Sequence, residues 1–74
     1  MKEISIDTSI HDLTEMYPEL IPVLVGLGFA GVADPAMRQS HGKVMTIRKG
    51  SQMLGKDPAD LVKSLEKHGF TAPT

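Results

Sequence analysis

Proline and glycine divide this 74-residue chain into segments that have room only for short helices. Two of these segments open with an Asp-Pro pair, at Asp34-Pro35 and Asp57-Pro58. Aspartate caps the free amides of a helix start, and proline fits the first turn because its missing N–H would have no partner there. Glycine suits a helix end because it adopts a positive φ without strain. The pattern predicts five helices, in the ranges 10–17, 18–28, 35–42, 47–54 and 58–69.

Capping residues support two of these helices. Either Thr8 or Ser9 can cap the first helix, and Thr46 can cap the fourth, because a hydroxyl accepts a hydrogen bond from an amide of the first turn. In the first helix, Ile10, Leu13 and Met16 recur at a spacing of three residues and are predicted to form its apolar stripe. We therefore expect the helices to begin where these caps stand.

Pro22 and Gly50 interrupt the pattern. Pro22 lies inside the second predicted helix, where it removes a backbone donor, so we expect either a kink or a later start near Pro22. Gly50 lies inside the fourth, where it costs about 1 kcal/mol of helix propensity relative to alanine. Near the N-terminus, Ile4 and Ile6 alternate with polar residues, which is typical of an extended lead-in or a short strand.

Length and composition predict one domain over residues 1–74, an all-α bundle of about five short helices. Residues 1–3 and 72–74 are expected to fray. The absence of cysteine excludes a disulfide framework and thiolate-bound metal. No segment resembles a signal peptide, and no apolar run is long enough to span a bilayer. We expect a soluble, cytoplasmic protein that does not act on membranes.

Charge is strongly segregated along the chain. Residues 1–35 carry one Lys against six Asp or Glu, whereas no acidic residue stands between Asp34 and Asp57. Residues 36–56 therefore carry a charge of +5, although the whole chain carries −1. The sequence predicts a basic surface with neighbouring methionines, and its candidate binding residues are Arg38, Lys43, Arg48, Lys49, Met37 and Met45.

The same order of features resembles the DUF1858 family of small helical domains. The resemblance covers about 4–70 and is carried by Tyr17-Pro18-Glu19-Leu20, by the helix end at Gly28-Phe29 and by the closing His68-Gly69-Phe70. It implies a small helical domain without an assigned function. The middle of the chain is similar to the subgroup found alone or preceding DUF438, PAS and hemerythrin-like domains, which implies a partner among such proteins. Many members carry a Cys-x-x-Cys pair after the second helix, and this chain has Gly31 and Asp34 where the two cysteines would fall.

The sequence does not predict an enzyme, a metal site or a cofactor. It has no cysteine nucleophile, and no serine shows a His-plus-acid pattern. The three histidines, His11, His41 and His68, lack the spacing of a helical metal site. A nucleic-acid partner is not expected either, because the net charge is negative and no exposed aromatic platform is evident.

Two functions and one structural alternative remain open at this stage. The first function is a non-enzymatic interaction or regulatory module, which presents the basic, methionine-containing face to an acidic protein partner or to its own copy. The second is a sensor of a small anion held by Arg38, Lys43 and the amides near Thr46. The structural alternative is that the cations pair internally, with Asp12, Glu15 and Glu19 or, for Arg38, with Asp34.

Overall fold

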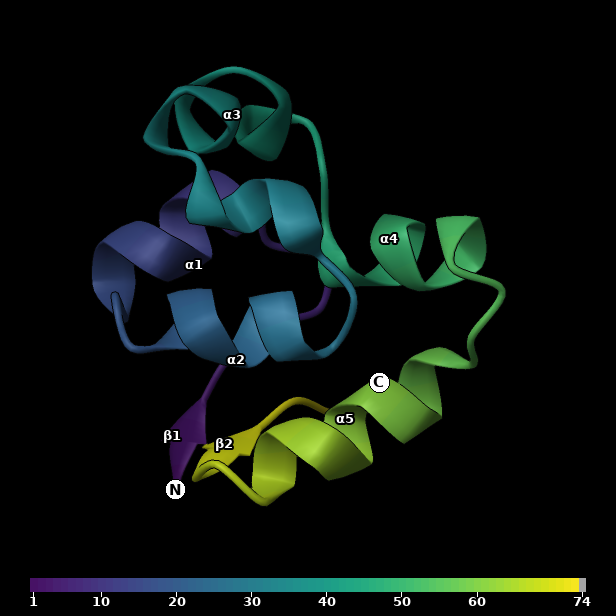
Figure 1. Ribbon diagram of the computed structural model, residues 1–74. Coiled ribbons are helices and arrows are strands. Elements are labelled where there is room, and N and C mark those ends of the chain that lie inside the picture. The colour runs from purple at the N-terminus through teal and green to yellow at the C-terminus, as the bar shows by residue number, and fades with distance from the viewer. Residues whose placement is uncertain (74) are drawn as a thin grey trace.

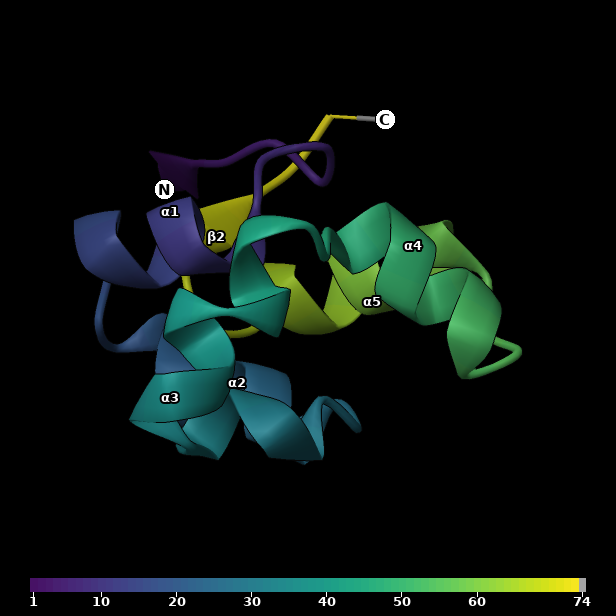
Figure 2. The same ribbon diagram turned by 90° about the horizontal axis from the view of Figure 1, so that it is seen from above.

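The structure is a computed structural model that describes residues 1–73. Short helices pack around one apolar core, and the two ends of the described chain meet in a small parallel sheet (Figures 1 and 2). Five α-helices, two 3-10 helices and two strands occur within residues 1–73, in the order β1 (Lys2–Glu3), α1 (Ile10–Met16), α2 (Leu20–Gly26), η1 (Ala30–Ala33), α3 (Pro35–Gln39), η2 (His41–Lys43), α4 (Ile47–Met53), α5 (Pro58–Glu66) and β2 (Phe70–Thr71). The predicted all-α fold class is confirmed.

The predicted caps begin four of the five α-helices in the described chain. Each capping side chain accepts a hydrogen bond from an amide two or three residues later, at 2.9–3.1 Å, and these caps are Ser9, Asp34, Thr46 and Asp57. The third helix is shorter than predicted, because it ends at Gln39 and the chain continues into η2. The fifth ends at Glu66, with Gly69 following at φ +87°.

The start of α2 resolves the alternatives that Pro22 left open. The helix begins at Leu20, two residues after Pro18, so Pro22 is its third residue. The first amides of a helix have no intrahelical acceptor, so proline there sacrifices no hydrogen bond. The later start is therefore correct, and no interior hydrogen bond of α2 is lost.

Three of the residues expected to fray are held in the fold, because Lys2 and Glu3 form a strand and Ala72 is buried. β1 pairs in parallel with β2, with Lys2 opposite Phe70, and the Ile4 amide donates to the Thr71 carbonyl at 2.8 Å. Ala72 is 2% exposed, and only Thr74 lies outside the described residues. The pairing arises because Ile4 and Phe70 both contribute to the core, which draws the two ends together.

Met16 does not join the apolar stripe that its spacing predicted. Its side chain is 56% exposed, whereas Ile10 and Leu13 are buried. A step of three residues falls about 60° short of a full helical turn, so two such steps carry Met16 about 120° away from Ile10. Thr14, closer to the direction of Ile10, is buried instead and donates its hydroxyl to the Ile10 carbonyl at 3.0 Å.

An ion pair ties the N-terminal arm to α4. The Arg48 side chain donates two hydrogen bonds to the Asp7 carboxylate, at 2.7 and 3.2 Å, and the Arg48 amide donates to the Ile6 carbonyl at 3.1 Å. The hydrogen bonds from the guanidinium favour the ionised carboxylate, so they lower the pKa of Asp7. Both side chains remain accessible to water, so the contribution to stability is expected to be small.

Gly50 explains how α4 approaches the turn after α2. A Cβ atom at Gly50 would lie 2.0 Å from Cε1 and 2.6 Å from Cζ of the Phe29 ring. Only glycine therefore lets Phe29 pack directly against the backbone of α4. The helix propensity lost at Gly50 is the cost of this close approach.

We predict that Gly50→Ala destabilises the fold by about 1–3 kcal/mol, because the added methyl group displaces the Phe29 ring. Propensity alone would predict the opposite sign. The matched control is Gly26→Ala at the end of α2, where a Cβ meets nothing within 4 Å. Urea denaturation should show a stable or slightly stabilised Gly26→Ala protein, and equal midpoints for the two variants would contradict the assigned contact.

We also predict that Asp7→Asn is less stable than the wild type at pH 7 and that the difference shrinks in acid. Because the folded-state pKa of Asp7 is lowered, the stabilisation is present above the ordinary aspartate pKa of about 3.9 and is lost as the pH falls through the folded value. Thermal unfolding of Asp7→Asn and of the wild type, between neutral pH and strong acid, measures this difference in stability. Arg48→Gln should show the same dependence of stability on pH. The double variant should lose no more stability than either single variant, because both changes remove the same ion pair.

Candidate functional site

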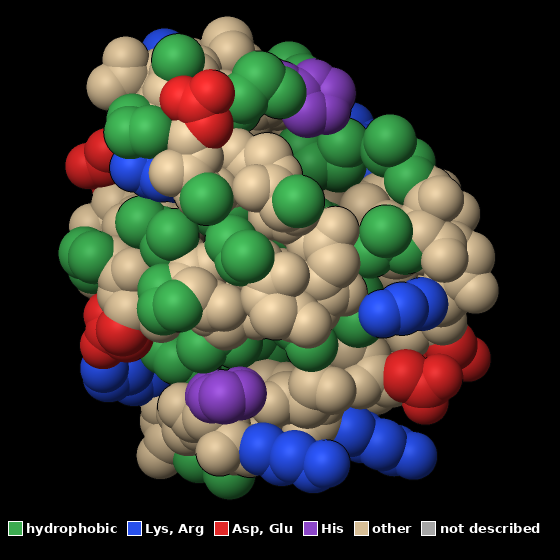
Figure 3. Space-filling view, in the orientation of Figure 1, with side chains coloured by type: hydrophobic (Ala, Val, Ile, Leu, Met, Phe, Trp, Pro, Cys, Tyr) green, Lys and Arg blue, Asp and Glu red, His purple; other side chains and the backbone are tan. Residues whose placement is uncertain are grey.

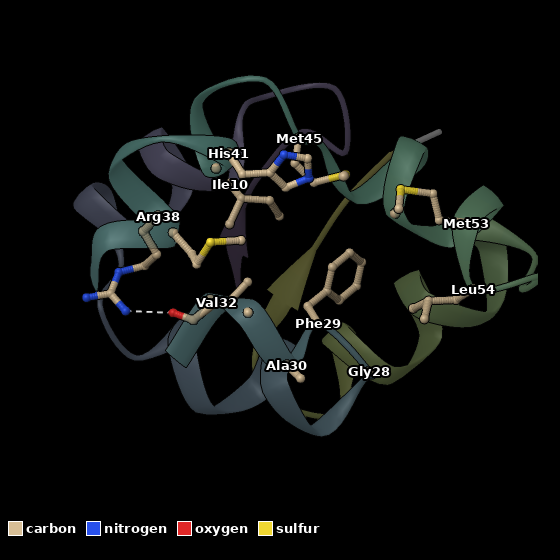
Figure 4. A pocket seen from close by; sticks show the side chains of 14 residues that line it. Ile10, Gly28, Phe29, Ala30, Val32, Arg38, His41, Met45, Met53 and Leu54 are labelled. Atoms are coloured by element: carbon tan, nitrogen blue, oxygen red, sulfur yellow. Dashed lines mark hydrogen bonds between the residues drawn. The ribbon is translucent and has the colours of Figure 1, made fainter. Parts of the chain in front are cut away.

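A groove of about 250 Å³ opens between the turn after α2 and the segment that runs from α3 to α4 (Figure 4). We call it the methionine groove. Its lining is mostly apolar and consists of Ile10, Gly28, Phe29, Ala30, Gly31, Val32, Met37, Arg38, His41, Gly42, Met45, Gly50, Met53 and Leu54. Ile10, Phe29 and Val32 are buried members of the core, so the groove is built on the core itself.

The rim of the groove exposes large apolar side chains to water. Met53 is 73% exposed, Met37 is 42% exposed and Leu54 is 39% exposed. Figure 4 shows Met53 and Leu54 at one end and Arg38 at the other, with Phe29 between them. Exposed apolar side chains gathered around a hollow are typical of a binding site, whereas single exposed ones are ordinary.

Glycine keeps the groove open. A Cβ at Gly28, which has φ +113°, would lie 3.1 Å from Cδ1 of Leu54. The Met37 Cε atom lies 3.8 Å from the position that a Cβ of Gly31 would take, which is ordinary contact distance. A side chain at Gly31 would therefore fit sterically but would occupy part of the hollow.

The structure brings together three of the six residues predicted from the sequence. Met37, Arg38 and Met45 line the methionine groove, whereas Lys43, Arg48 and Lys49 do not. Lys49 lies immediately before Gly50, which does line the groove. Figure 3 shows Lys and Arg side chains spread around the edges of the face that it presents, with hydrophobic side chains between them.

The cations of residues 36–56 have different partners. Arg48 is paired with the Asp7 carboxylate, which sequence reasoning did not anticipate. Three other cations donate to main-chain carbonyls: Arg38 to Val32 at 2.6 Å, Lys49 to Val44 at 3.3 Å and Lys56 to Leu27 at 3.2 Å. A carbonyl is neutral, so these three cations keep their charge beside the groove.

The carboxylates proposed as internal partners are used elsewhere. Glu19 pairs with Lys2, and this hydrogen bond lowers the pKa of Glu19. Asp12 and Glu15 lie 3.3 and 3.8 Å from the His11 ring nitrogens, on the same helix. Asp34 accepts from the Ala36 amide rather than from Arg38. The proposed pairing of basic residues with these four acids is therefore absent from the described residues.

The backbone amides near Thr46 are also engaged within the chain. The Arg48 amide donates to the Ile6 carbonyl, the Lys49 amide to the Thr46 hydroxyl and the Gly50 amide to the Thr46 carbonyl. An anion at this helix start would have to displace these acceptors. The structure therefore offers fewer free donors there than the sequence suggested.

Sequence reasoning identified only part of the lining. Met53 and Leu54 were not among the candidate residues, although both line the groove beside Met37 and Met45. Val44, a neighbour of Met45 in the sequence, is 63% exposed and lies outside the groove. The sequence contains no functional signal for Phe29, Gly50 or η1, apart from the glycines that mark helix ends. Their role depends on contacts between distant segments.

The described residues contain neither a metal-binding cluster nor a membrane-spanning helix. Within residues 1–73, no group of three or more His, Asp or Glu side chains is arranged to hold a metal ion. None of the helices in the same residues is both long and apolar enough to cross a membrane.

Comparison with known proteins gives a family but no activity. A solved structure described as "the conserved domain protein from Streptococcus pneumoniae TIGR4" shares 27% sequence identity and superposes with a TM-score of 0.91, covering 99% of this chain and 92% of that one. A comparison with curated proteins finds no match. The model of the family described as "Domain of unknown function (DUF1858)" matches residues 4–62, so the chain belongs to the DUF1858 family.

Proposed function

We propose that this DUF1858 domain is a non-enzymatic interaction module whose methionine groove receives the apolar side chains of an acidic helical segment from a protein partner. The observation that carries this proposal is the groove itself, with exposed methionines at its rim and unneutralised cations beside it. Size, charge and backbone geometry each restrict the occupant.

The size of the groove suits side chains rather than a large cofactor. An apolar cavity of about 150 Å³ accommodates benzene, and pockets for drug-sized ligands begin at about 300 Å³. At about 250 Å³ the groove matches one or two large apolar side chains. Methionine adapts its shape to such anchors because its side chain is unbranched and flexible.

The charge beside the groove favours an acidic occupant. Arg38 lines the groove, and Lys49 and Lys56 donate to carbonyls of Val44 and Leu27, each next to a lining residue. Cations that already bind a neutral carbonyl can still attract a carboxylate. Complementary charge of this kind raises association rates and selects partners.

The backbone favours a helical occupant over a strand. Within residues 1–73 the sheet has two strands of two residues each, so it offers almost no edge to an added strand. An amphipathic helix that lays its apolar face into a groove needs no free backbone groups. The methionine groove fits that mode of recognition.

The alternative function, a sensor of small anions near Arg38, Lys43 and Thr46, has less support. Amides of the α4 start donate within the chain, and Arg38 already donates to the Val32 carbonyl. The family resemblance implies a hemerythrin-like or PAS-containing protein as the partner, and a second copy of this chain is the other candidate. A cytoplasmic location stays a prediction from the sequence.

The test is a titration with a synthetic acidic amphipathic helical peptide, followed by nuclear magnetic resonance of the labelled domain. We predict shifts concentrated at the methionine groove. Met37→Gln with Met53→Gln keeps the side-chain size but removes apolar character, and it should weaken binding about tenfold or more. A basic peptide with the same apolar residues should bind more weakly than the acidic one.

The matched control is Val44→Thr, which also replaces an exposed apolar residue by a polar one of similar shape outside the groove. It should leave the affinity unchanged. Equal losses in the two variants, or shifts that avoid the groove, would refute the proposal. Circular dichroism of each variant establishes that the fold is intact.

A further inference from the structure

We infer that the acidic helical segment is α1 of a second copy of this chain, so that the domain associates with itself head to tail. This inference rests on the proposed function, since it names the partner of the methionine groove. It is carried by the chemistry of the outward face of α1, which complements the groove in both charge and apolar character.

The outward face of α1 combines two carboxylates with one apolar anchor. The Asp12 and Glu15 side chains are 67% and 71% exposed, and Met16 is 56% exposed. Asp12 lies three residues before Glu15 and four before Met16, so the three side chains are neighbours on the helix surface. Within residues 1–73 their ionic contacts are confined to His11 on the same helix.

This face is already folded in the free chain. Ser9 caps α1, and the buried residues Ile10 and Leu13 fix the helix to the core. A preformed helix loses no conformational entropy by becoming ordered on binding. A few contacts from its carboxylates and its methionine therefore suffice for a weak association. A disordered peptide of the same sequence would bind less tightly.

Ile10 at the start of α1 lines the groove, but the exposed face of α1 lies apart from the end of the groove that Met53 and Leu54 of the α4 segment form (Figures 1 and 2). Figures 1 and 2, which differ by a rotation about the horizontal axis, both place α1 and α4 at opposite sides of the molecule. A rigid chain therefore cannot place its own Met16 against its own Met53. Two different surfaces that bind each other across copies form a heterologous contact, which continues into a ring or an open chain.

The charge distribution along the sequence agrees with this arrangement. α1 belongs to the segment 1–35, which carries six acidic residues and one lysine, and the groove cations belong to the segment 36–56, which carries five cations and no acid. Salt screens the attraction between exposed charges of opposite sign, and the screening length falls to about 3 Å at 1 M ionic strength. Self-association should therefore weaken when salt is added.

The experiment uses sedimentation of the full chain and two variants that each disable one surface. Glu15→Lys reverses a charge on α1 and keeps the groove, whereas Lys49→Glu reverses a charge beside the groove and keeps α1. We expect the wild-type average mass to rise with protein concentration, and each variant alone to stay near the monomer mass. An equimolar mixture should associate, because the unaltered groove of one variant meets the unaltered α1 of the other, and the two reversed charges are again of opposite sign.

Each outcome has a defined meaning. A wild-type chain that stays monomeric at the highest soluble concentration, or a mixture that does not associate, would overturn the inference. Association that survives Glu15→Lys but not Lys49→Glu would show that another acidic segment occupies the groove, and it would also overturn it. Met16→Gln provides a second α1 variant, which should reduce association without changing charge.

The same samples separate this inference from the proposed function. If the monomeric wild type still binds the acidic amphipathic peptide through the methionine groove, the proposed function stands and only self-association fails. If the chain neither associates nor binds the peptide, both fail. Thermal unfolding of the variants excludes misfolding as the cause of a lost interaction.

Discussion

The contact between the Phe29 ring and the bare backbone of Gly50 is the interaction on which the rest of the architecture depends. It joins the turn after α2 to α4, and a single added Cβ would leave no room for it. These two segments are also the walls of the methionine groove, so the contact fixes their separation. Met53 and Leu54 follow Gly50 by three and four residues, so they lie on the same face of the helix, at the groove rim. One glycine thus sets both the packing of the core and the shape of the candidate site.

Helix starts were predictable from sequence because their causes are local. The caps Ser9, Thr46 and Asp57 act on amides only two or three residues away, so residue type and spacing contain the information. Features that depend on distant contacts were not predictable. The pairing of β1 with β2 joins residues at opposite ends of the chain, and Asp7 bonds to Arg48 across 41 positions. Met16 was wrongly predicted to be buried, because each step of three residues falls about 60° short of a full helical turn.

The candidate site was partly predictable for the same reason. The methionines and cations of one segment predicted which stretch of chain forms the candidate site, and Met37, Arg38 and Met45 do line the groove. Composition does not indicate the direction in which each side chain points. Arg48 turns toward Asp7, and Lys43 lies outside the groove, although both belong to the same basic segment. Direction depends on where the neighbouring segments lie, which only the fold determines.

Folding leaves the two oppositely charged segments largely unpaired with each other. Among the described residues, Asp7–Arg48 is the one ion pair between the segments 1–35 and 36–56. Glu19 pairs with Lys2 inside the first segment, and Arg38 and Lys56 donate to neutral carbonyls. Exposed ion pairs contribute little to stability, so the fold loses little by leaving these charges unmatched. The same charges retain their full attraction for a second molecule, because a carbonyl partner does not cancel a cation. Charge segregation therefore suits the proposed recognition of a partner better than it suits stability. The cations beside the groove stay unneutralised after folding because their partners are carbonyl groups.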